Sequence, residues 1–394
     1  MNAALPPPAP YALWKGRDVA MLPAAGLRAV VHSVYARACN IQLEDGSLLA
    51  LLAPELPRIA WGVGLAALPK PFSFFMRAGM GCCLSATGLH ISSKPSFNLC
   101  WKNSPLWKAD SVRPIGSASP TALLYLKKLA EGKNWPGWTA LSLLYAAKAQ
   151  HIGAHHACYH ARVQEKILVP SVSFSYTKQK NSVCSGYHRS KALSPQASFA
   201  ALLHSDDIFL QQAASVCRRL AAAWQADDAT QFCTAACGLV GLGVGLTPSG
   251  DDFLGGLLAG LRATATAERQ QRFVHPLCAA LLSAAHSTGV VAGSFLRHAC
   301  RLSFSNTVVA VAQLLPLSFD LVAQQPALHK APSAATLAAK LQCKASLQAS
   351  VKSRAQKPQV LQAAAEALLA FGSTSGADTL AGLLFAGSLT EEKV

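Results

Sequence analysis

The sequence lacks the long apolar runs that membrane proteins need. Although 51% of its 394 residues are hydrophobic, no stretch offers the roughly 18 uninterrupted apolar residues of a membrane-spanning helix. The N-terminal stretch MNAALPPPAPYALWKGRD has no basic segment followed by an apolar one, so no signal peptide is expected. Both absences favour a cytoplasmic protein without contact to a membrane.

A metal-binding cysteine pattern is also missing. None of the 12 cysteines belongs to a C-x-x-C pair, and most are expected to be buried thiols in a reducing compartment. Four histidines in HIGAHHACYH, residues 151–160, could share helical faces, but Glu165 is the one carboxylate near them. These patterns predict no metal centre and no cofactor.

Acidic residues are scarce, with 19 Asp and Glu against 35 Lys and Arg, and the net charge is +16. Residues 151–197 hold six bases and one acid, and residues 330–357 hold six bases and no acid, so these two segments account for +11 of that charge. No helix-turn-helix, zinc-finger or RNP pattern accompanies them, and nucleic acid is not the expected partner. We interpret both segments as flexible basic insertions.

The order of patterns along the chain predicts an α+β protein. Residues 1–20 are Pro-rich and are interpreted as a lead-in. Residues 21–110 contain short β-like runs separated by Gly, Pro and Ser, which predicts a small β-rich domain. Helical periodicity dominates from residue 115 to residue 394, which predicts a larger, mostly helical domain.

The most informative stretch is GLVGLGVGLTPSGDDFLGGLLAGL, residues 238–261, and a reduced copy, FGSTSGADTLAGLLFAG, occupies residues 371–387. At an offset of 126 residues, seven of the twelve positions 247–258 are identical in the copy. We interpret the pair as an internal duplication or as two equivalent functional turns. Packing of glycine-containing helices alone is the simpler alternative.

Each copy has the spacing of a helix start. Ser249 with Asp252, and Ser375 with Asp378, have the separation of a capping box. Each is therefore predicted to cap a helix, which gives two related capped turns. Asp251 has no counterpart in the second copy, where Ala377 stands. We expect Asp251 to be free to face the loop or solvent.

A glycine-rich loop that leads into a helix N-terminus is a natural anion site. We expect both helix starts to face one pocket for a small anion, with Asp251 as the candidate catalytic residue and as a group that could hold a divalent cation. No Ser-His-Asp or Cys-His order supports nucleophilic catalysis. Arg297 and Arg301 could bind a carboxylate, with surface placement as the alternative. The predicted anion-binding residues are Gly243, Gly245, Thr247, Ser249, Gly250, Asp252, Thr374, Ser375, Gly376 and Asp378.

Three stretches together resemble the bacterial AllH-like family: VVHSVYARACNIQLEDGSLLAL, GLGVGLTPSGDDFLGGLLAGL and GSTSGADTLAGLL. The resemblance implies a cytoplasmic subunit that works with two other subunits in oxamate carbamoyltransferase, during allantoin degradation. That reaction exchanges a carbamoyl group between oxalurate and phosphate and yields oxamate and carbamoyl phosphate. The resemblance does not assign catalysis to this subunit.

Two other functions stay open on the sequence. The chain could be a non-catalytic scaffolding subunit whose glycine turns serve helix packing alone. It could also bind a nucleic acid or an acidic partner through the basic segments. Both alternatives are separable from anion binding by ligand titration.

Overall fold

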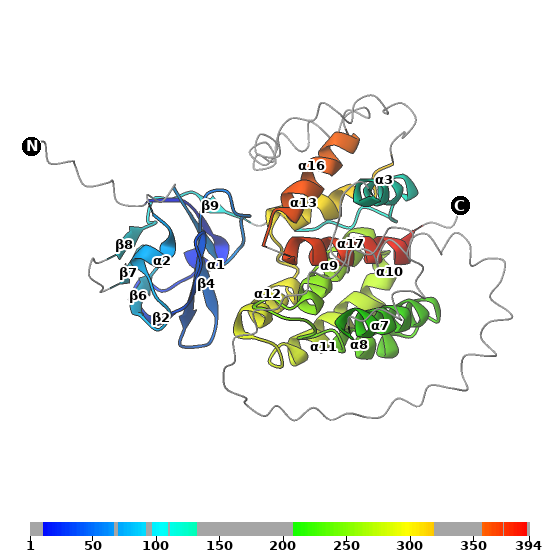
Figure 1. The fold of residues 1–394 in the computed structure, drawn as a ribbon, viewed down its shortest axis with the longest axis horizontal. Coiled ribbons are helices and arrows are strands. Elements are labelled where there is room, and N and C mark those ends of the chain that lie inside the picture. Colours follow the sequence, from blue (N-terminus) through cyan, green and yellow to red (C-terminus); the bar gives the residue numbers. More distant parts are fainter. Residues whose placement is uncertain are drawn as a thin grey trace, which may run out of the picture.

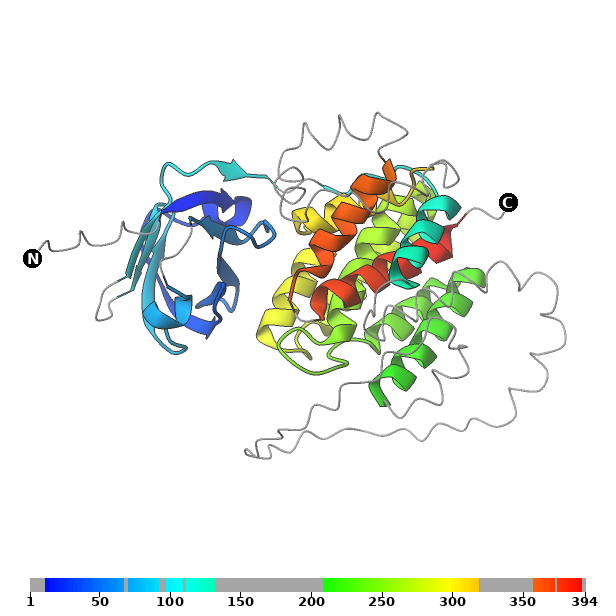
Figure 2. The ribbon, with the colours of Figure 1, turned by 45° about the horizontal axis from the view of Figure 1, so that its top comes forward.

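The computed structural model of the chain describes residues 11–66, 70–91, 97–108, 111–131, 208–318, 357–372 and 374–391. Its N-terminal part is a curved β-sheet and its C-terminal part is a group of helices, as Figures 1 and 2 show from two directions. This arrangement confirms the predicted order of a β-rich part followed by a helical part. Both basic segments lie outside the described residues, apart from Lys357, which begins a helix. The histidine cluster lies outside them as well.

The sheet has nine strands in the order β8-β7-β6-β2-β3-β4-β5-β1-β9. Neighbouring strands are antiparallel except at the pairs β4–β5 and β1–β9, which are parallel. The strands are β1 (Ala12–Gly16), β2 (Leu27–Val34), β3 (Ala38–Leu43), β4 (Leu48–Leu52), β5 (Gly62–Leu65), β6 (Gly81–Ser85), β7 (Gly88–Ile91), β8 (Phe97–Cys100) and β9 (Leu106–Trp107). Two short helices accompany them, α1 (Arg17–Ala20) and α2 (Phe72–Phe75).

The sheet begins earlier than the sequence predicts. Residues 12–20, interpreted as part of a lead-in, form β1 and α1, and β1 pairs with both β5 and β9. Ala12, Trp14 and Gly16 alternate buried with more exposed neighbours, which is the period-two pattern of a strand. The prolines that precede this short run obscured it in the sequence.

The helical part contains eleven helices among the described residues. They are α3 (Pro120–Glu131), α7 (Ile208–Gln225), α8 (Ala229–Cys237), α9 (Ser249–Thr264), α10 (Ala267–Arg269), the π-helix η1 (Gln270–Val274), α11 (His275–Ala284), α12 (Val290–Cys300), α13 (Asn306–Leu314), α16 (Lys357–Leu369) and α17 (Ser375–Thr390). No helix within these ranges is both long enough and apolar enough to cross a bilayer.

Helices α9 and α17, which carry the two copies of the glycine motif, form the centre of the helical part. Both are buried around nearly their whole circumference, as central helices are. They make the most extensive helix–helix contact of the described residues. Figure 2 shows α17, in red, crossing the group, with α16 along one side and the pair α7 and α8, in green, on the other.

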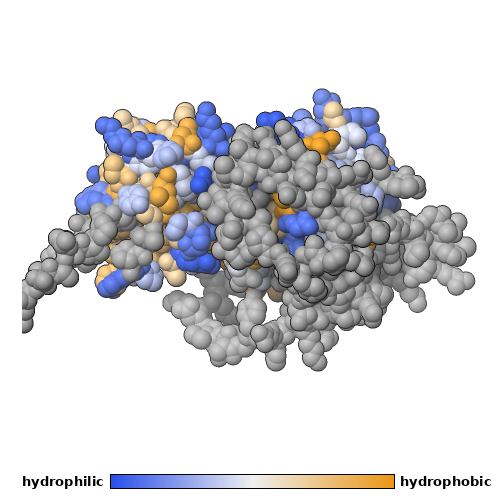
Figure 3. All heavy atoms as spheres, turned by 90° about the horizontal axis from the view of Figure 1, so that it is seen from above, coloured by the Kyte–Doolittle hydropathy of each residue, from blue (hydrophilic) through white to orange (hydrophobic). Residues whose placement is uncertain are grey.

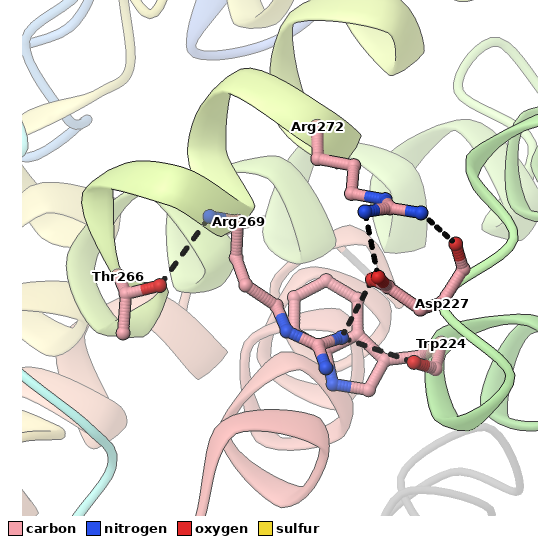
Figure 4. A network of polar contacts seen from close by, with 5 residues as sticks. All are labelled: Trp224, Asp227, Thr266, Arg269 and Arg272. Carbon is pink, nitrogen blue, oxygen red and sulfur yellow. Dashed lines mark hydrogen bonds and ion pairs between the residues drawn. The ribbon is translucent and has the colours of Figure 1, made fainter.

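A polar network holds the α7–α8 hairpin against the π-helix (Figure 4). Asp227, in the left-handed region with φ 57°, pairs with Arg272 at 2.8 Å and lies 3.8 Å from Arg269. The Arg269 guanidinium donates to the Trp224 carbonyl at 3.0 Å and lies over the Trp224 ring. Because these ion pairs are partly exposed, their geometry orients the hairpin more than it stabilises the fold.

The sheet contacts the helical part through α12 and the start of α13. The Arg58 amide donates to the Asn306 side-chain oxygen at 2.9 Å, and the Asn306 amide donates to the Arg58 carbonyl at 3.2 Å. Trp61 stacks on His298 with ring centroids 3.7 Å apart and meets Phe295 edge-on. On the face drawn in Figure 3, hydrophobic and hydrophilic residues are interspersed where they are visible.

Candidate functional site

The two copies of the motif meet directly. A Cβ at Gly256 would lie 1.9 Å from the Thr379 carbonyl oxygen, and a Cβ at Gly382 would lie 2.0 Å from the Phe253 carbonyl oxygen. Gly256 and Gly382 are the same position of the two copies. The absence of both side chains therefore lets the backbones of α9 and α17 touch where they cross.

The predicted capping boxes are wrong. The cap residue of α9 is Pro248 and that of α17 is Thr374, and neither makes a side-chain capping bond. The first-turn amides bond instead to the backbone, since the Pro248 carbonyl accepts from Asp251 and Asp252 at 2.9 and 3.2 Å. Ser249 and Ser375 are the first residues of their helices, one position after the cap.

Each serine instead lies beside the aspartate of the other copy. The Ser249 hydroxyl lowers the pKa of the Asp378 carboxyl, and the Ser375 hydroxyl lowers that of the Asp252 carboxyl. Thr247 and Ser375 share a hydrogen bond of 2.8 Å between their hydroxyl oxygens. The Ser-Gly-x-Asp sequence thus joins the two helix starts to each other.

Asp378 is buried, and Asp252 is half-buried with its Oδ2 atom shielded from water. Asp378 is 1% exposed, and burial raises its pKa to about 6 although the Ser249 and Thr374 hydroxyls oppose the rise. Burial also raises the pKa of Asp252 well above its usual range, and repulsion from Asp378 and Asp251 adds to the effect. The Oδ2 atoms of Asp252 and Asp378 are buried without a hydrogen-bond partner in the part of the chain that the structure describes.

Asp251 is not free, contrary to the expectation from the sequence. It is 6% exposed, its Oδ1 accepts from the Gly241 amide at 3.0 Å, and its Oδ2 accepts from the Thr288 hydroxyl at 2.6 Å. Burial raises the pKa of Asp251, while these two hydrogen bonds oppose the rise. Asp251 therefore ties the glycine loop, residues 238–248, to the loop before α12.

The glycine loop turns through three residues in the left-handed region, Gly241, Gly243 and Gly245, with φ of 73°, 122° and 101°. Other residue types would be strained there. The tip of the loop is open, because Val244 and Leu246 are 56% and 46% exposed. The Leu246 carbonyl oxygen lies 4.0 Å from the Cβ position of Gly289, so the tip borders the start of α12.

A cleft of about 700 Å³ lies between the sheet and α12. The loop Ser287–Gly289 and α12 form one wall, and the β3–β4 turn and Trp61 lie opposite. The N-terminus of α12 has no side-chain cap, so its first amides remain available to an anion. The charged or polar residues that line the cleft include Asp18, Asp45, Thr288, Arg297, His298 and Arg301.

The electrostatics of the cleft favour a neutral His298. Its side chain is 12% exposed, its ring lies on Trp61, and its Nδ1 is 3.6 Å from Asp18. Burial lowers the pKa of His298 to about 4. The negative charge of Asp18 opposes this fall, and the positive charges of Arg301 and Arg297 add to it. Arg297 and Arg301 therefore supply the positive charge of this wall.

A second, smaller cavity of about 70 Å³ lies beneath Trp61 and reaches Asp252, Asp251 and Thr379. Most of its lining is apolar, with Phe295 and Phe304 among the residues that close it. It therefore connects the interface between sheet and helices with the paired helix starts. Within the described ranges, no three His, Cys, Asp or Glu side chains converge as a metal-binding group.

The structure separates the predicted site residues into two groups. Thr247, Ser249, Asp252, Ser375 and Asp378 lie together at the buried helix starts. Gly250 and Gly376 stand beside them, each with its Cβ position 2.0 Å from a backbone carbonyl oxygen, and the Thr374 hydroxyl lowers the pKa of Asp378. Gly243 packs on the start of α9, with its Cβ position 2.8 Å from the Ser249 amide nitrogen, whereas Gly245 lies in the exposed tip of the loop.

Sequence reasoning missed part of the cleft. Arg297 and Arg301 were candidates, but Thr288, His298 and Trp61 carried no recognisable motif. The stacking of Trp61 on His298 joins residues that are far apart in sequence, so no local pattern signals it. A basic pair one helical turn apart was the single local signal for this wall.

Comparisons with curated proteins and with solved structures returned no match. A family model does match part of the chain. The matched segment contains the glycine loop, α9, α12 and α13, and with them one wall of the cleft. Residues 239–324 match the model of the family described as oxamate carbamoyltransferase subunit AllH, and this match supports the assignment of the chain to an AllH-like family.

Proposed function

We propose that this chain is an AllH-like subunit of a carbamoyltransferase-type complex and that it binds a small anionic metabolite. The family match supports the first part, since the family is named for a subunit of oxamate carbamoyltransferase. Such a subunit implies further subunits, and the resemblance of the motifs implies two of them. The relevant anions are oxalurate, oxamate, carbamoyl phosphate and phosphate.

The cleft is a better place for the anion than the paired helix starts. Those starts hold the buried carboxyls of Asp252 and Asp378, and an ionised carboxylate repels an anion. The cleft also contains two acids, Asp18 and Asp45, but unlike the helix starts it offers basic side chains, Arg297 and Arg301, and the uncapped N-terminus of α12. An arginine fork and helix amides are the groups that bind carboxylates and phosphates.

The observation that carries this proposal is the position of Arg297 on the wall of the cleft, on the helix whose uncapped start opens into it. The Thr288 hydroxyl, held by Asp251 at 2.6 Å, stands at that start. The exposed glycine tip lies at the edge of the same wall. The glycine loop, with Gly243 and Gly245, then acts as the rim of the anion site.

Isothermal titration with each of the four anions tests the proposal. The wild type should bind at least one of them, and Arg297→Gln should weaken that binding by roughly tenfold to a hundredfold, the range for losing a charged hydrogen bond. Arg77→Gln is the matched control, because Arg77 is an exposed arginine outside the cleft. It should bind as the wild type does.

The outcomes separate the alternatives. If Arg297→Gln binds like the wild type while Ser249→Ala loses binding, the anion site lies at the helix starts and the assignment to the cleft is wrong. If the wild type binds none of the four anions but forms a stable complex with its partner subunits, the chain is a scaffold. A complex is detected by size-exclusion chromatography of the co-expressed subunits.

A further inference from the structure

The paired helix starts contain two carboxyl oxygen atoms that accept no hydrogen bond from the described residues. The Oδ2 atoms of Asp252 and Asp378 are buried and have no hydrogen-bond partner among the described residues, and the whole of Asp378 is 1% exposed. A buried carboxylate oxygen without a partner is costly. Two of them at matching positions of two copies of one motif call for a common explanation.

The polar side chains that act on these carboxyls are hydroxyls. Those of Ser375 and Thr247 lower the pKa of Asp252, and those of Ser249 and Thr374 lower the pKa of Asp378. Neither carboxyl forms an ion pair with a Lys, Arg or His of the described residues. A set of carboxylate and hydroxyl oxygens without nitrogen or sulfur suits hard cations.

The balance of charge favours a cation as well. Each helix N-terminus contributes roughly half a positive charge, so two of them offset about one of the two carboxylate charges. About one negative charge remains in a buried place, and the neighbouring Asp251 adds to it. Burial of an uncompensated charge is strongly unfavourable, so either a proton or a metal cation must neutralise it.

We propose that Asp252 and Asp378 hold one hard divalent cation, Mg²⁺ or Ca²⁺, between the starts of α9 and α17. Asp251, the residue at which the sequence placed a cation, is not part of this site, because the Gly241 amide and the Thr288 hydroxyl occupy both of its oxygens. The cavity of about 70 Å³ that reaches Asp252 provides room beside the site.

The cation would join the two halves of the helical centre. Ser249 and Ser375 each lie beside the aspartate of the other helix. An ion shared by Asp252 and Asp378 would add a second connection between α9 and α17. A ligand that binds the folded state alone raises the melting temperature. At about a hundredfold excess over Kd, the expected rise is on the order of 5–10 °C for a domain of this size.

The experiment uses the full chain, freed of metal with EDTA and dialysed, then titrated with MgCl₂ or CaCl₂ alone. Melting temperature and isothermal titration are measured for the wild type, Asp252→Asn and Asp378→Asn. The wild type should gain melting temperature with at least one of the two cations, and both variants should lose that gain. Glu268→Gln, an exposed first-turn acid of α10, is the matched control and should respond as the wild type does.

The alternative occupant is a proton. If neither cation changes the melting temperature or gives heat of binding with the wild type, and the two Asn variants are at least as stable at pH 7, the carboxyls share protons and the proposal is wrong. If the Asn variants fail to fold, Ser375→Ala carries the test, because it should lower cation affinity while it leaves both carboxyls in place. Unchanged affinity in Ser375→Ala, in that case, also contradicts the site.

The cation test is independent of the anion proposal. Arg297→Gln should leave cation binding unchanged, since Arg297 belongs to the cleft and not to the helix starts. Failure of the four anions to bind would therefore not alter the expected response to MgCl₂ or CaCl₂. A response to cations that disappears in Arg297→Gln would place the ion in the cleft and contradict the assignment to Asp252 and Asp378.

Discussion

The crossing of α9 and α17 gives the sharpest test of the fold, because adjacent glycines differ completely in their surroundings. A Cβ at Gly256 would meet the backbone of α17, with the Thr379 oxygen at 1.9 Å and the Leu383 nitrogen at 3.0 Å. Backbone atoms cannot rotate away, so Gly256→Ala must push the helices apart. A Cβ at the neighbouring Gly255 meets nothing within 4 Å.

The magnitudes follow from two opposing effects. Replacing glycine by alanine inside a helix stabilises it by about 1 kcal/mol, whereas overpacking a well-filled contact costs about 1–3 kcal/mol, and occasionally more. At Gly256 the overlap with backbone places the cost at or beyond the upper end, so the net loss should be about 2 kcal/mol. Gly255→Ala should gain up to about 1 kcal/mol.

The measurement is equilibrium denaturation of both variants, with melting temperature as a second readout. The two should differ by about 3 kcal/mol, or roughly 6–12 °C. Gly382→Ala should resemble Gly256→Ala, because its Cβ would lie 2.0 Å from the Phe253 carbonyl oxygen. The double variant should cost less than the sum, since helices already separated by one methyl admit the second. Equal stability of Gly255→Ala and Gly256→Ala would refute the close crossing.

Three further perturbations test the interface and the cleft. Burial lowers the pKa of His298 to about 4, so the neutral ring contributes stability above pH 6.5 that is lost as the pH falls toward 4. The free energy of unfolding, measured as a function of pH, should fall by about 3 kcal/mol over this range. The same fall should be absent in His298→Gln. Thr288→Val removes the hydroxyl bonded to Asp251 at 2.6 Å and should cost about 1–3 kcal/mol in urea denaturation; an unchanged midpoint would mean that the loop is held by other contacts. Asn306→Ala removes the oxygen that accepts from the Arg58 amide and should speed hydrogen exchange of that amide, whereas unchanged exchange would contradict this contact between sheet and helices.

The order of a sheet followed by helices can be predicted from local sequence patterns. Short runs of β-branched and apolar residues between turns predict the sheet, and helical periodicity predicts the second part. The predicted start of the β-rich domain is wrong at residues 12–20, where a strand of five residues follows a Pro-rich stretch. The ends of strands and helices depend on backbone contacts with neighbouring elements, and these contacts cannot be read from the sequence.

The sequence predicts which residues lie at the paired helix starts, but not which of them contact one another. Matching residues at an offset of 126 placed Ser249 with Asp252 and Ser375 with Asp378 as local pairs. In the structure the pairs are exchanged, because Pro248 and Thr374 occupy the cap positions and move the serines into the first turn. A serine there can reach a helix that packs alongside, and the close crossing at Gly256 and Gly382 brings that helix within reach.

The difference between the two copies indicates which one serves the cleft. The Cβ position of Gly250 faces the carbonyl of Leu239, eleven residues earlier, and that of Gly376 faces the carbonyl of Leu368, eight residues earlier. The first loop is therefore three residues longer for the same packing role. The added length carries the left-handed glycines, and Asp251 anchors it to Thr288 at the start of α12.

The second copy has a shorter loop with one left-handed glycine, Gly372, at φ 68°. Ala377, 5% exposed, stands where Asp251 stands in the first copy. Because the contacts of Ser, Gly and Asp are equivalent in both copies, these shared residues explain the joining of the two helices but not the cleft. What distinguishes the first copy is the connection through Asp251 to the wall that holds Arg297. Changes in the shared residues should therefore act mainly on stability, and changes in the additions mainly on anion binding.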